Sequence, residues 1–470
     1  MSHYIHHYWQ VYMEYVNILK SLTYQHIPLG LISNFYQYIS PEVRDRMENE
    51  AFGEQLQTSC PVPQDIQPFF DEKKKSIKPV AYNPGSGKVL LHFDHLRFTE
   101  NNYTRFHPAK TLLLARWKKA DYFGIPVISK PELAGEVNKE AHAEYIKEAN
   151  ALFEAYAQHP VFGDSFFKER LNKDIPQFID VIDQSERLLK QHHISAIVVG
   201  TTEDVYSRVL ALQTIKRGIT SICLQHGALM GDEAFLPIFT TTHGVFGKYE
   251  KDWYEDKGCQ PEQVDVTGHP RFDLVQERKP IQKDLFYHKL NFNATNKTVL
   301  VATQPFSGDF YGAILKKIAV QNDVQLIIKP HPWEIARNQL NDYVALERSS
   351  SQVRLVKKEI DLYDMLPYVD LVITLTSTVG LEAMLFNKSV LIGKMAGGRR
   401  YPYYESLQPY YFEDPQKLAE QAVTILMNEQ EMQKAKQQGA LFIKENYPHA
   451  HSTDVLLSLL KTKTGVDFHK

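Results

Sequence analysis

Short apolar runs alternate with helix-like stretches along most of this chain, and this alternation constrains its fold more than any other feature. From about residue 88 onward, runs such as ISAIVVG, VQLIIK and LVITL are each followed by a segment whose apolar residues recur every three or four positions. Strands that alternate with helices pair in parallel, because a parallel connection needs a crossover. The sequence therefore predicts an α/β protein built on doubly wound parallel sheets.

The alternation is interrupted after TGHPRFDLVQERKP, where the sequence turns polar before NKTVLVATQP restarts it. Residues 275–297 are therefore the predicted linker. We predict an N-terminal Rossmann-like domain over 1–275 with a helical N-terminal extension, a second Rossmann-like domain over 276–446, and a final helix over 447–470. Two doubly wound domains that face each other place a central cleft between their strand ends.

The composition of the chain argues against several classes of function. The formal net charge is -3, so no global field draws the chain to nucleic acid, and 43% hydrophobic with 23% charged residues is typical of a soluble globular protein. The sequence shows neither an apolar run near the roughly 18 residues of a membrane span nor a secretion signal. The cysteines Cys60, Cys223 and Cys259 are scattered, which fits a reducing cytoplasm and argues against structural zinc.

The first forty residues are rich in aromatic side chains and leave two interpretations open. The segment HHYWQVYMEYVNILKSLTYQ is compatible with helical spacing, so it can pack as a helix on its own domain. It can also rest on a membrane surface, which would place the protein at the inner face of the cell membrane.

The motif IIKPHPWE places a cation and an imidazole at the end of a predicted strand. Pro332 suits the first position of a helix, where its missing N–H costs nothing, so His331 lies at the helix entry. Free amides and a partial positive charge at a helix start favour a phosphate, and Lys329 adds a full charge. The alternative is a rigid loop with a surface lysine and a capping histidine. We favour the anion site, because ligands bind at the carboxyl ends of parallel strands.

A second motif, LVITLTSTVGLEAM, breaks from strand to helix at Thr376, Ser377 and Thr378. Three hydroxyls at a helix start can cap it, and they can also hold phosphate oxygens. Gly380 would allow a ligand to approach closely. Glu382 complements the helix dipole and can accept hydrogen bonds from ribose. Two phosphate-favouring helix starts in one domain suit a diphosphate.

The third motif, SICLQHGALM, places His226 after a strand of the first domain, with Gly227 opening space for a substrate. An imidazole with a pKa near 6.5 can act as general base toward a hydroxyl. A lone histidine is more often structural, so its position alone leaves both roles open.

Other polar residues are compatible with more than one role. Arg271 belongs to a hinge or reaches the nucleotide, and we favour the hinge. Arg399 and Arg400, in the loop GKMAGGRRYPYYE, form either a solvated basic loop or a clamp on a phosphorylated ligand. His92 and Asp94 share one face of a strand, but the sequence predicts no metal site there or elsewhere.

Taken in order, LQHG, GVFGKYEKDWYEDKG, VDVTGHPRFD, KPHP and TSTVGLEAMLFNKSVLIG resemble the bacterial GT-B transferases of surface-polymer synthesis. The chain is similar to the CDP-glycerol glycerophosphotransferase family and to capsule polysaccharide transferases, and more distantly to the UDP-N-acetylglucosamine 2-epimerase fold. The resemblance covers roughly residues 190–410.

The resemblance implies a role for each motif. It implies that His226 is the base that activates the acceptor hydroxyl. It implies that His331, with Lys329 beside it, contacts the donor diphosphate, that Ser377 and Thr378 hold phosphate, and that Glu382 binds ribose.

We therefore expect a GT-B transferase that moves a sugar or a polyol phosphate from a nucleotide-activated donor to a glycan or lipid-linked acceptor, without a metal ion or other cofactor. Such an enzyme would contribute to a surface polysaccharide or a teichoic-acid-type polymer. The run STVGLEAMLFNK favours a sugar nucleotide as donor. The alternatives are a CDP-glycerol glycerophosphotransferase, a sugar-nucleotide 2-epimerase and a non-catalytic nucleotide-binding protein.

Overall fold

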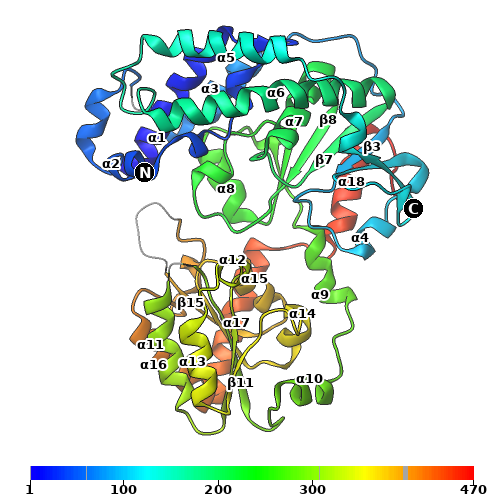
Figure 1. Ribbon diagram of the computed structural model, residues 1–470. Coiled ribbons are helices and arrows are strands. Elements are labelled where there is room, and N and C mark those ends of the chain that lie inside the picture. Colours follow the sequence, from blue (N-terminus) through cyan, green and yellow to red (C-terminus); the bar gives the residue numbers. More distant parts are fainter. Residues whose placement is uncertain (1, 60, 306, 395–400) are drawn as a thin grey trace. The chain divides into compact units, whose positions relative to one another are not determined.

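The computed structural model describes residues 2–59, 61–305, 307–394 and 401–470. The chain divides into two compact units. In Figure 1 the first is coloured from blue to green, with its C-terminal residues in red, and the second is coloured from green to orange. The first unit contains the chain up to His226, then 231–271 and 451–470, and the second contains 227–230 and 272–450. The chain thus enters the second unit at Phe272, a few residues before the predicted boundary, and returns to the first at His451.

The first unit is built on an eight-stranded sheet with the order β10-β9-β8-β7-β3-β4-β6-β5. Among the described strands of this sheet, β5 runs antiparallel to its neighbour and the other pairs are parallel. The strands are β3 (Lys88–His92), β4 (Thr111–Ala115), β5 (Asp121–Tyr122), β6 (Ile125–Ser129), β7 (Ile194–Val199), β8 (Thr220–Leu224), β9 (Thr242–Val245) and β10 (Val264–Val266). The winding direction changes between β3 and β7, and ligands of doubly wound sheets bind at the carboxyl ends beside such a switch point.

Helices of the first unit cover both faces of this sheet. They are α1 (His3–Ile18), α2 (Pro41–Arg46), α3 (Ile66–Lys74), α4 (Glu100–Thr104), α5 (Lys139–Glu154), α6 (Ser165–Gln191), α7 (Val205–Arg217), α8 (Lys248–Asp256) and α18 (Ser452–Thr464). A small hairpin, β1 (Thr23–Tyr24) with β2 (Ile27–Pro28), follows α1. Since both faces of a parallel sheet are buried, its strands are apolar throughout, as in β7.

The aromatic side chains of α1 form part of the core. The ring of Tyr12 stacks on Phe35 with centroids 4.9 Å apart, and Phe70 packs against Trp9 and Tyr12. The indole N–H of Trp9 donates to Oδ2 of the fully buried Asp232 at 2.6 Å. Of the two interpretations of this segment, the helix packed on its own domain is confirmed. The aromatic face of α1 is covered by protein.

The longest helix departs from its predicted bounds. Apolar residues three and four positions apart predict helices over 133–157 and 174–191, but α5 begins only at Lys139 and α6 already begins at Ser165. Pro176 lies inside α6, and proline usually ends a helix because it lacks the amide proton. The buried apolar stripe on both sides of Pro176 keeps the helix continuous.

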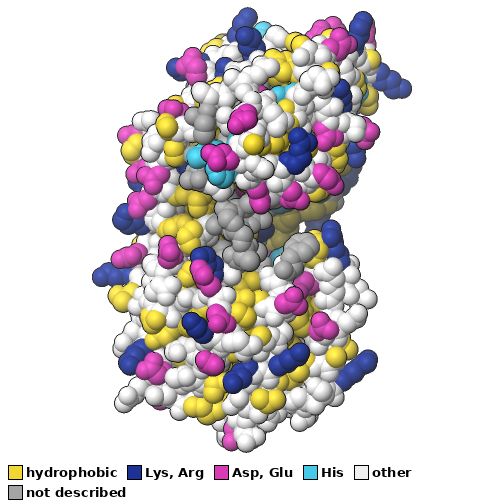
Figure 2. All heavy atoms as spheres, turned by 90° about the vertical axis from the view of Figure 1, so that its left-hand side faces the viewer, with side chains coloured by type: hydrophobic (Ala, Val, Ile, Leu, Met, Phe, Trp, Pro, Cys, Tyr) yellow, Lys and Arg dark blue, Asp and Glu magenta, His cyan; other side chains and the backbone are white. Residues whose placement is uncertain are grey.

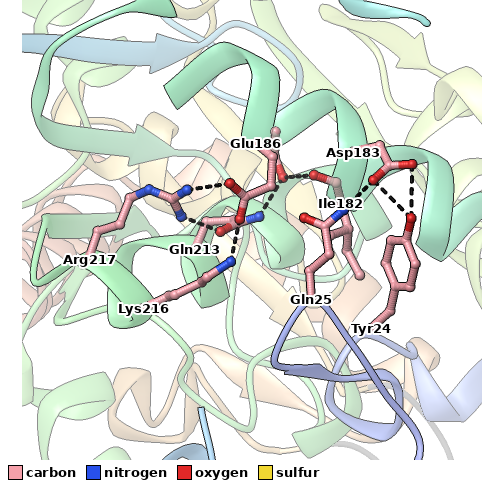
Figure 3. A network of polar contacts seen from close by, with 9 residues as sticks. Tyr24, Gln25, Ile182, Asp183, Glu186, Gln213, Lys216 and Arg217 are labelled. Atoms are coloured by element: carbon pink, nitrogen blue, oxygen red, sulfur yellow. Dashed lines mark hydrogen bonds and ion pairs between the residues drawn. The ribbon is translucent and has the colours of Figure 1, made fainter. Parts of the chain in front are cut away.

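Buried ion pairs join α6 to α7 (Figure 3). Oε2 of Glu186 accepts from Nη2 of Arg217 at 2.6 Å, and its other oxygen accepts from Lys216. One turn earlier, Asp183 accepts from the hydroxyl of Tyr24 at 3.1 Å. These contacts fix α6 against both α7 and the β1–β2 hairpin, so the outer helical layer is tied to the helix that follows β7.

The last helix returns to the first unit and covers one face of its sheet. Leu456 and Leu460 of α18 are fully buried in a cluster with Val89 of β3 and Val198 of β7. Figure 1 shows α18, in red, beside β3 and β7. The C-terminal residues therefore complete the core that the N-terminal residues begin.

The second unit is a six-stranded parallel sheet with the order β13-β12-β11-β14-β15-β16. Its strands are β11 (Lys297–Ala302), β12 (Val324–Lys329), β13 (Val353–Leu355), β14 (Leu371–Thr374), β15 (Ser389–Gly393) and β16 (Tyr411–Phe412). Numbered within the unit, this order is 3-2-1-4-5-6, the order of the dinucleotide-binding Rossmann fold. Its switch point lies between β11 and β14.

Helices connect these strands and surround the sheet. They are α9 (Leu274–Glu277), α10 (Lys283–Leu290), α11 (Gly308–Ala319), α12 (Pro332–Ala336), α13 (Asn341–Ser349), α14 (Leu362–Met365), α15 (Thr378–Leu385), α16 (Pro415–Met427) and α17 (Glu429–Asn446). The predicted linker 275–297 belongs to this unit and contains α10. Arg278 anchors the segment through ion pairs to Asp361 at 2.9 Å and to Asp364 at 2.7 Å.

Charged side chains of both signs are interspersed over the face shown in Figure 2, as expected for a net charge of -3. Within the described ranges, every helix is too short or too polar to cross a membrane.

Candidate functional site

Three strands of the second unit end at the same level beside its switch point. Ala302, the last residue of β11, is in register with Lys329 on β12 and with Thr374 on β14. Adjacent strands lie about 4.8 Å apart, so the loops that follow Lys329 and Thr374 rise about 10 Å from each other. The predicted residues of the KPHP and TSTVG motifs are therefore brought to one edge of one sheet.

His331 caps the short helix α12. Its Nδ1 accepts a hydrogen bond from the amide of Trp333 at 3.1 Å, and Pro332 takes the first helical position as predicted. Since Nδ1 is the acceptor, the neutral ring carries its proton on Nε2, which makes Nε2 a donor. Burial lowers the pKa of His331, although Glu334 opposes the shift. The ring is therefore a neutral donor at physiological pH.

Glu334, which the sequence analysis did not single out, holds this loop in place. One carboxylate oxygen accepts from the amide of His331 at 2.8 Å and from Oγ1 of Thr303 at 2.6 Å. The other oxygen accepts from the hydroxyl of Tyr343 at 3.1 Å. Thr303 directly follows β11, so Glu334 links the ends of β11 and β12. The His331–Glu334 spacing is that of a capping box, a signal present in the sequence.

Two features of the KPHP loop differ from the prediction. The helix α12 has only five residues, so its dipole is small and any anion would be bound chiefly by side chains and local amides. The ammonium of Lys329 donates to the carbonyl oxygens of Lys357 at 2.5 Å and Ile360 at 3.5 Å. These bonds use two of its three N–H donors and tie the loop after β13 to the end of β12.

Tyr404 fixes the loop after β14. Its hydroxyl accepts from the amide of Leu381 at 3.0 Å and donates to the carbonyl of Ser377. Ser377 caps α15 through the amide of Val379 at 3.3 Å. A Cβ at Gly380 would lie 2.9 Å from Ile392 and 3.0 Å from the Tyr404 hydroxyl. Gly380 therefore makes room for the protein's own side chains, and its role in admitting a ligand stays a prediction.

The other residues predicted in this motif lie at the same strand end. Thr376 and Glu382 are buried, with 4% and 5% of their surface exposed, while Thr378 is partly exposed at the first position of α15. Ser377 and Thr378 are thus partly exposed at the start of α15, and Glu382 is buried farther along the same helix. Arg399 and Arg400 lie outside the described residues.

His226 follows β8 at the carboxyl edge of the first sheet, two strands from β3. Gln225 anchors its loop, because its amide donates to the Gly244 carbonyl at 2.8 Å and its side chain donates to Glu250 at 3.0 Å. The imidazole stacks on Phe235 with centroids 5.1 Å apart and 11° between the planes. The stacking therefore fixes the plane of the imidazole ring.

Glu203 is the polar partner of His226 and was missed in the sequence analysis. Its Oε2 lies 3.4 Å from Nε2 of His226, and the side chains are 36% and 20% exposed. The carboxylate comes from the turn between β7 and α7, where the amide of Glu203 donates to Oγ1 of Thr201 at 3.0 Å. A histidine beside an oriented carboxylate is the arrangement of an activated general base.

Both members of this pair favour their neutral forms in the free protein. Burial lowers the pKa of His226 to about 4, with Arg97 adding to the shift. Burial also raises the pKa of Glu203 to about 7, while Arg208 opposes it. An ion pair would shift both values in the opposite directions, so desolvation dominates here. His226 is therefore unprotonated, and able to accept a proton, across the physiological range.

Two further predicted residues lie where the chain passes between the units. Gly227 follows His226 and belongs to the second unit, and a Cβ there would meet no atom within 4 Å. Arg271 is the last residue of the first unit before Phe272, and its amide donates to Nδ1 of the buried His269 at 3.1 Å. This position agrees with the hinge interpretation of the TGHPRFD motif, and a role for its guanidinium toward nucleotide stays a prediction.

The metal-type residues His92, at the end of β3, and Asp94, in the loop after it, have other partners. Asp94 forms ion pairs with Lys130 at 2.5 Å and Arg116 at 2.8 Å, while Nδ1 of His92 lies 2.9 Å from the Ser207 hydroxyl. Across the described part of the chain, His, Cys, Asp and Glu side chains form no group of three that could hold a metal ion.

The strand ends and motifs of the second unit lie in a segment that is similar to known proteins. Residues 294–396 match the family model described as capsule polysaccharide biosynthesis protein. This part of the chain is similar to capsule polysaccharide biosynthesis proteins. The match confirms the predicted resemblance to bacterial surface-polymer transferases, and it supports a transferase that acts in surface-polymer synthesis. No curated protein matches the chain.

Solved structures share the fold. A UDP-N-acetylglucosamine 2-epimerase is 14% identical over 80% of this chain and 96% of its own, with a TM-score of 0.51. A glycosyltransferase from Rickettsia africae ESF-5 is 9% identical over 80% and 98%, with a TM-score of 0.51. Anabaena Alr3699/HepE in complex with UDP and glucose is 13% identical over 81% and 100%, with a TM-score of 0.50. The predicted GT-B-like α/β class, with two Rossmann-like units, is confirmed.

Proposed function

We propose that this protein transfers a sugar from a nucleotide-activated donor to a hydroxyl of a growing surface polymer. The observation that carries the proposal is the edge of the second sheet. Lys329 and Thr374 flank Ala302 there, in a segment that matches capsule polysaccharide biosynthesis proteins. Rossmann-like units bind nucleotides at this edge, beside the switch point. A related fold, Anabaena HepE, was crystallised with UDP and glucose, which supports a nucleoside diphosphate as the leaving group.

The second unit binds the donor in this proposal. Nε2–H of His331 and the hydroxyls of Ser377 and Thr378 donate to diphosphate oxygens, and Lys329 contributes positive charge. Glu334 and Tyr404 position these groups through the contacts described above, so little reorganisation is needed when the ligand arrives. Preorganised donors of this kind stabilise the charge that develops on a leaving phosphate, by several kcal/mol in comparable sites. Glu382 is assigned to the ribose.

The first unit supplies the base. His226 removes the proton of the acceptor hydroxyl, whose oxygen attacks the anomeric carbon. The bond from that carbon to the diphosphate oxygen breaks, and the nucleoside diphosphate leaves with the electron pair. The imidazolium formed on His226 is stabilised by the carboxylate of Glu203 at 3.4 Å. The protein's own donors and cations balance the charge in this scheme, so neither a metal ion nor another cofactor takes part.

The acceptor is a glycan or a lipid-linked precursor, and the reaction takes place in the cytoplasm at the inner face of the cell membrane. Because the aromatic face of α1 is buried, this location depends on the acceptor and not on that helix.

Paired variants test the proposal. His226→Ala should abolish turnover of the favoured donor and leave nucleotide binding nearly intact, whereas His331→Ala should weaken nucleotide binding. A thermal-shift panel of CDP, CMP, UDP and GDP identifies the nucleotide, since a bound ligand raises the melting temperature. Unchanged turnover in both variants overturns the mechanism.

The panel also separates the alternatives. A preference for CDP, with transfer of glycerol phosphate, would identify a glycerophosphotransferase. Conversion of the donor without an acceptor would identify an epimerase, whose fold this chain shares. Nucleotide binding without turnover of any donor would identify a nucleotide-binding protein.

A further inference from the structure

A small pocket opens at the carboxyl end of β3 in the first unit, and the proposed function gives it no role. It encloses about 340 Å³, and the side chains of Phe93, Phe98 and Tyr103 form its apolar wall. These rings pack on one another, with Tyr103 stacked on Phe93 at 5.9 Å and tilted against Phe98 at 5.5 Å. The wall is rigid, so this pocket is a preformed feature of the fold. We refer to it as the β3-end pocket.

The polar side of the β3-end pocket is positively charged. Arg97 and Arg116 line it together with Asp94 and His95. Asp94 is already engaged by Lys130 at 2.5 Å and by Nε of Arg116 at 2.8 Å. Although burial opposes the shift, hydrogen bonds from His92 and Lys130 hold the pKa of Asp94 well below its usual range. The lining thus carries one carboxylate, that of Asp94, and two guanidinium groups, those of Arg97 and Arg116, so its charge is positive.

The loop that carries two of the polar groups is held in an unfavourable backbone conformation. His95 has φ 63° and Arg97 has φ 55°, in the left-handed region that side chains rarely adopt. A Cβ on Gly200, after β7, would lie 2.2 Å from the carbonyl oxygen of His95. The loop thus packs directly on the switch point between β3 and β7, and only glycine at 200 permits it. Backbone strain of this kind persists where the surrounding structure enforces it, often beside functional sites.

Arg97 connects the pocket to the proposed base. Its Nη1 donates to the carbonyl oxygen of His226 at 2.6 Å. A ligand held by Arg97 and Arg116 would therefore lie next to the loop that carries the imidazole.

We propose that the β3-end pocket binds a phosphate group of the acceptor. Guanidinium groups pair with phosphate through parallel hydrogen bonds, and the aromatic wall suits the carbon skeleton attached to it. The volume fits a phosphorylated polyol or a single sugar phosphate. The inference rests on the proposed function only in naming the ligand as the acceptor, because phosphate binding is measured without turnover.

Titration calorimetry of the full chain with glycerol 3-phosphate and with glycerol tests the inference. Glycerol 3-phosphate should bind and glycerol should not. Arg116→Gln should raise the Kd for glycerol 3-phosphate about tenfold, a typical effect of losing one charge-assisted contact. Arg170→Gln is the matched control, because Arg170 also pairs through Nε with an aspartate, Asp174 at 3.3 Å, on the same unit. The Arg170→Gln variant should bind glycerol 3-phosphate with the Kd of the wild-type chain.

Three results would overturn the inference: no binding of glycerol 3-phosphate by the wild-type chain, equal binding of glycerol, or equal Kd values for the Arg116 and Arg170 variants. Thermal unfolding of both variants checks that they are folded. Arg116→Lys keeps the positive charge but loses the planar guanidinium group. Its Kd for glycerol 3-phosphate should therefore lie between those of wild type and Arg116→Gln.

Vesicles distinguish two sources of the phosphate. Phosphatidylglycerol vesicles bound more tightly by wild type than by Arg116→Gln would assign a lipid head group, and binding of glycerol 3-phosphate alone would assign the soluble part of the acceptor. His226→Ala should bind glycerol 3-phosphate normally. If no donor is turned over but Arg116→Gln still weakens phosphate binding, the pocket assignment holds and the proposed function fails.

Discussion

Nε2 of His226 lies 3.4 Å from Oε2 of Glu203, and the imidazole is stacked on Phe235. The two side chains come from the ends of neighbouring strands, β8 and β7. Burial keeps both neutral near pH 6, because the pKa of His226 is lowered to about 4 and that of Glu203 is raised to about 7. The base is therefore available over a wide pH range, while its charged partner is present only above about pH 7.

This difference predicts the pH dependence of transfer. The kcat/KM of the wild-type chain should rise through about pH 7, as Glu203 ionises and can stabilise the imidazolium. Glu203→Gln should lower kcat/KM above pH 7 by roughly tenfold to a hundredfold and remove the rise. Initial rates from pH 5 to 9 measure both effects. A rise of wild-type size in Glu203→Gln would show that another group titrates.

The same carboxyl predicts an effect on stability. Its pKa of about 7 in the folded chain exceeds the usual 4.5, so between these values the folded state binds the extra proton. Stability therefore falls as pH rises from 4.5 to 7. Glu203→Gln should unfold at a higher temperature than wild type at pH 8 and at the same temperature at pH 4.5. Other titrating groups contribute equally to both chains, so they cancel in the difference between the two melting temperatures. A difference in melting temperature that does not change with pH would contradict the raised pKa of Glu203.

His331 has a structural and a binding role that two substitutions separate. His331→Ala should lose about 1 kcal/mol of stability with the helix cap, and about tenfold in nucleotide affinity. Asparagine is a good cap but cannot place a donor where Nε2–H lies. His331→Asn should therefore retain stability and still lose the affinity. Denaturant unfolding and nucleotide titration give the two quantities, and full affinity in His331→Asn would refute the role of Nε2–H.

Tyr404→Phe tests how the loop after β14 is held. The change removes the hydroxyl that accepts from Leu381 and donates to Ser377, so it should cost about 1–2 kcal/mol and weaken nucleotide binding. Tyr287→Phe is the control, since the Tyr287 hydroxyl donates to the Tyr368 carbonyl at 3.2 Å in the same unit. It should lose some stability but bind nucleotide normally. Equal nucleotide affinity in both variants would argue against the Tyr404 contact.

Gly200→Ala tests the close packing at the first switch point. The new methyl group would lie 2.2 Å from the His95 carbonyl oxygen, so the loop must move, and we expect a loss of about 1–3 kcal/mol. Gly312→Ala, where a Cβ would meet no atom within 4 Å, should be neutral or stabilising by up to about 1 kcal/mol. Chemical denaturation of both variants makes the comparison. Similar stabilities would mean that the loop adapts without cost.

The sequence predicted those parts of the fold and site that depend on local pattern. The apolar runs predicted most of the parallel strands of both sheets, and Pro332 together with His331 marked the start of α12. The pattern did not indicate β4, whose run TLLLA is not bounded by glycine, nor the early start of α6, which continues through Pro176.

Contacts between distant strands could not be predicted. Glu203 and His226 become neighbours only because β7 and β8 pair in parallel, and a run of residues gives no direct sign of which strands are adjacent. Tyr404 reaches the Ser377 loop from a separate segment for the same reason. The role of Glu334 could have been predicted from the sequence, because its spacing from His331 is that of a capping box.

The position of α18 has a consequence for biosynthesis. Leu456 and Leu460 fill a face of the sheet whose strands are translated long before them. While the ribosome makes the second unit, that face lacks its cover and exposes an apolar surface that a chaperone or the unfinished chain itself must shield. A polypeptide that stops before His451 would keep this surface open, so its aggregation in the cell should resemble that of an interrupted domain even though its second unit is whole.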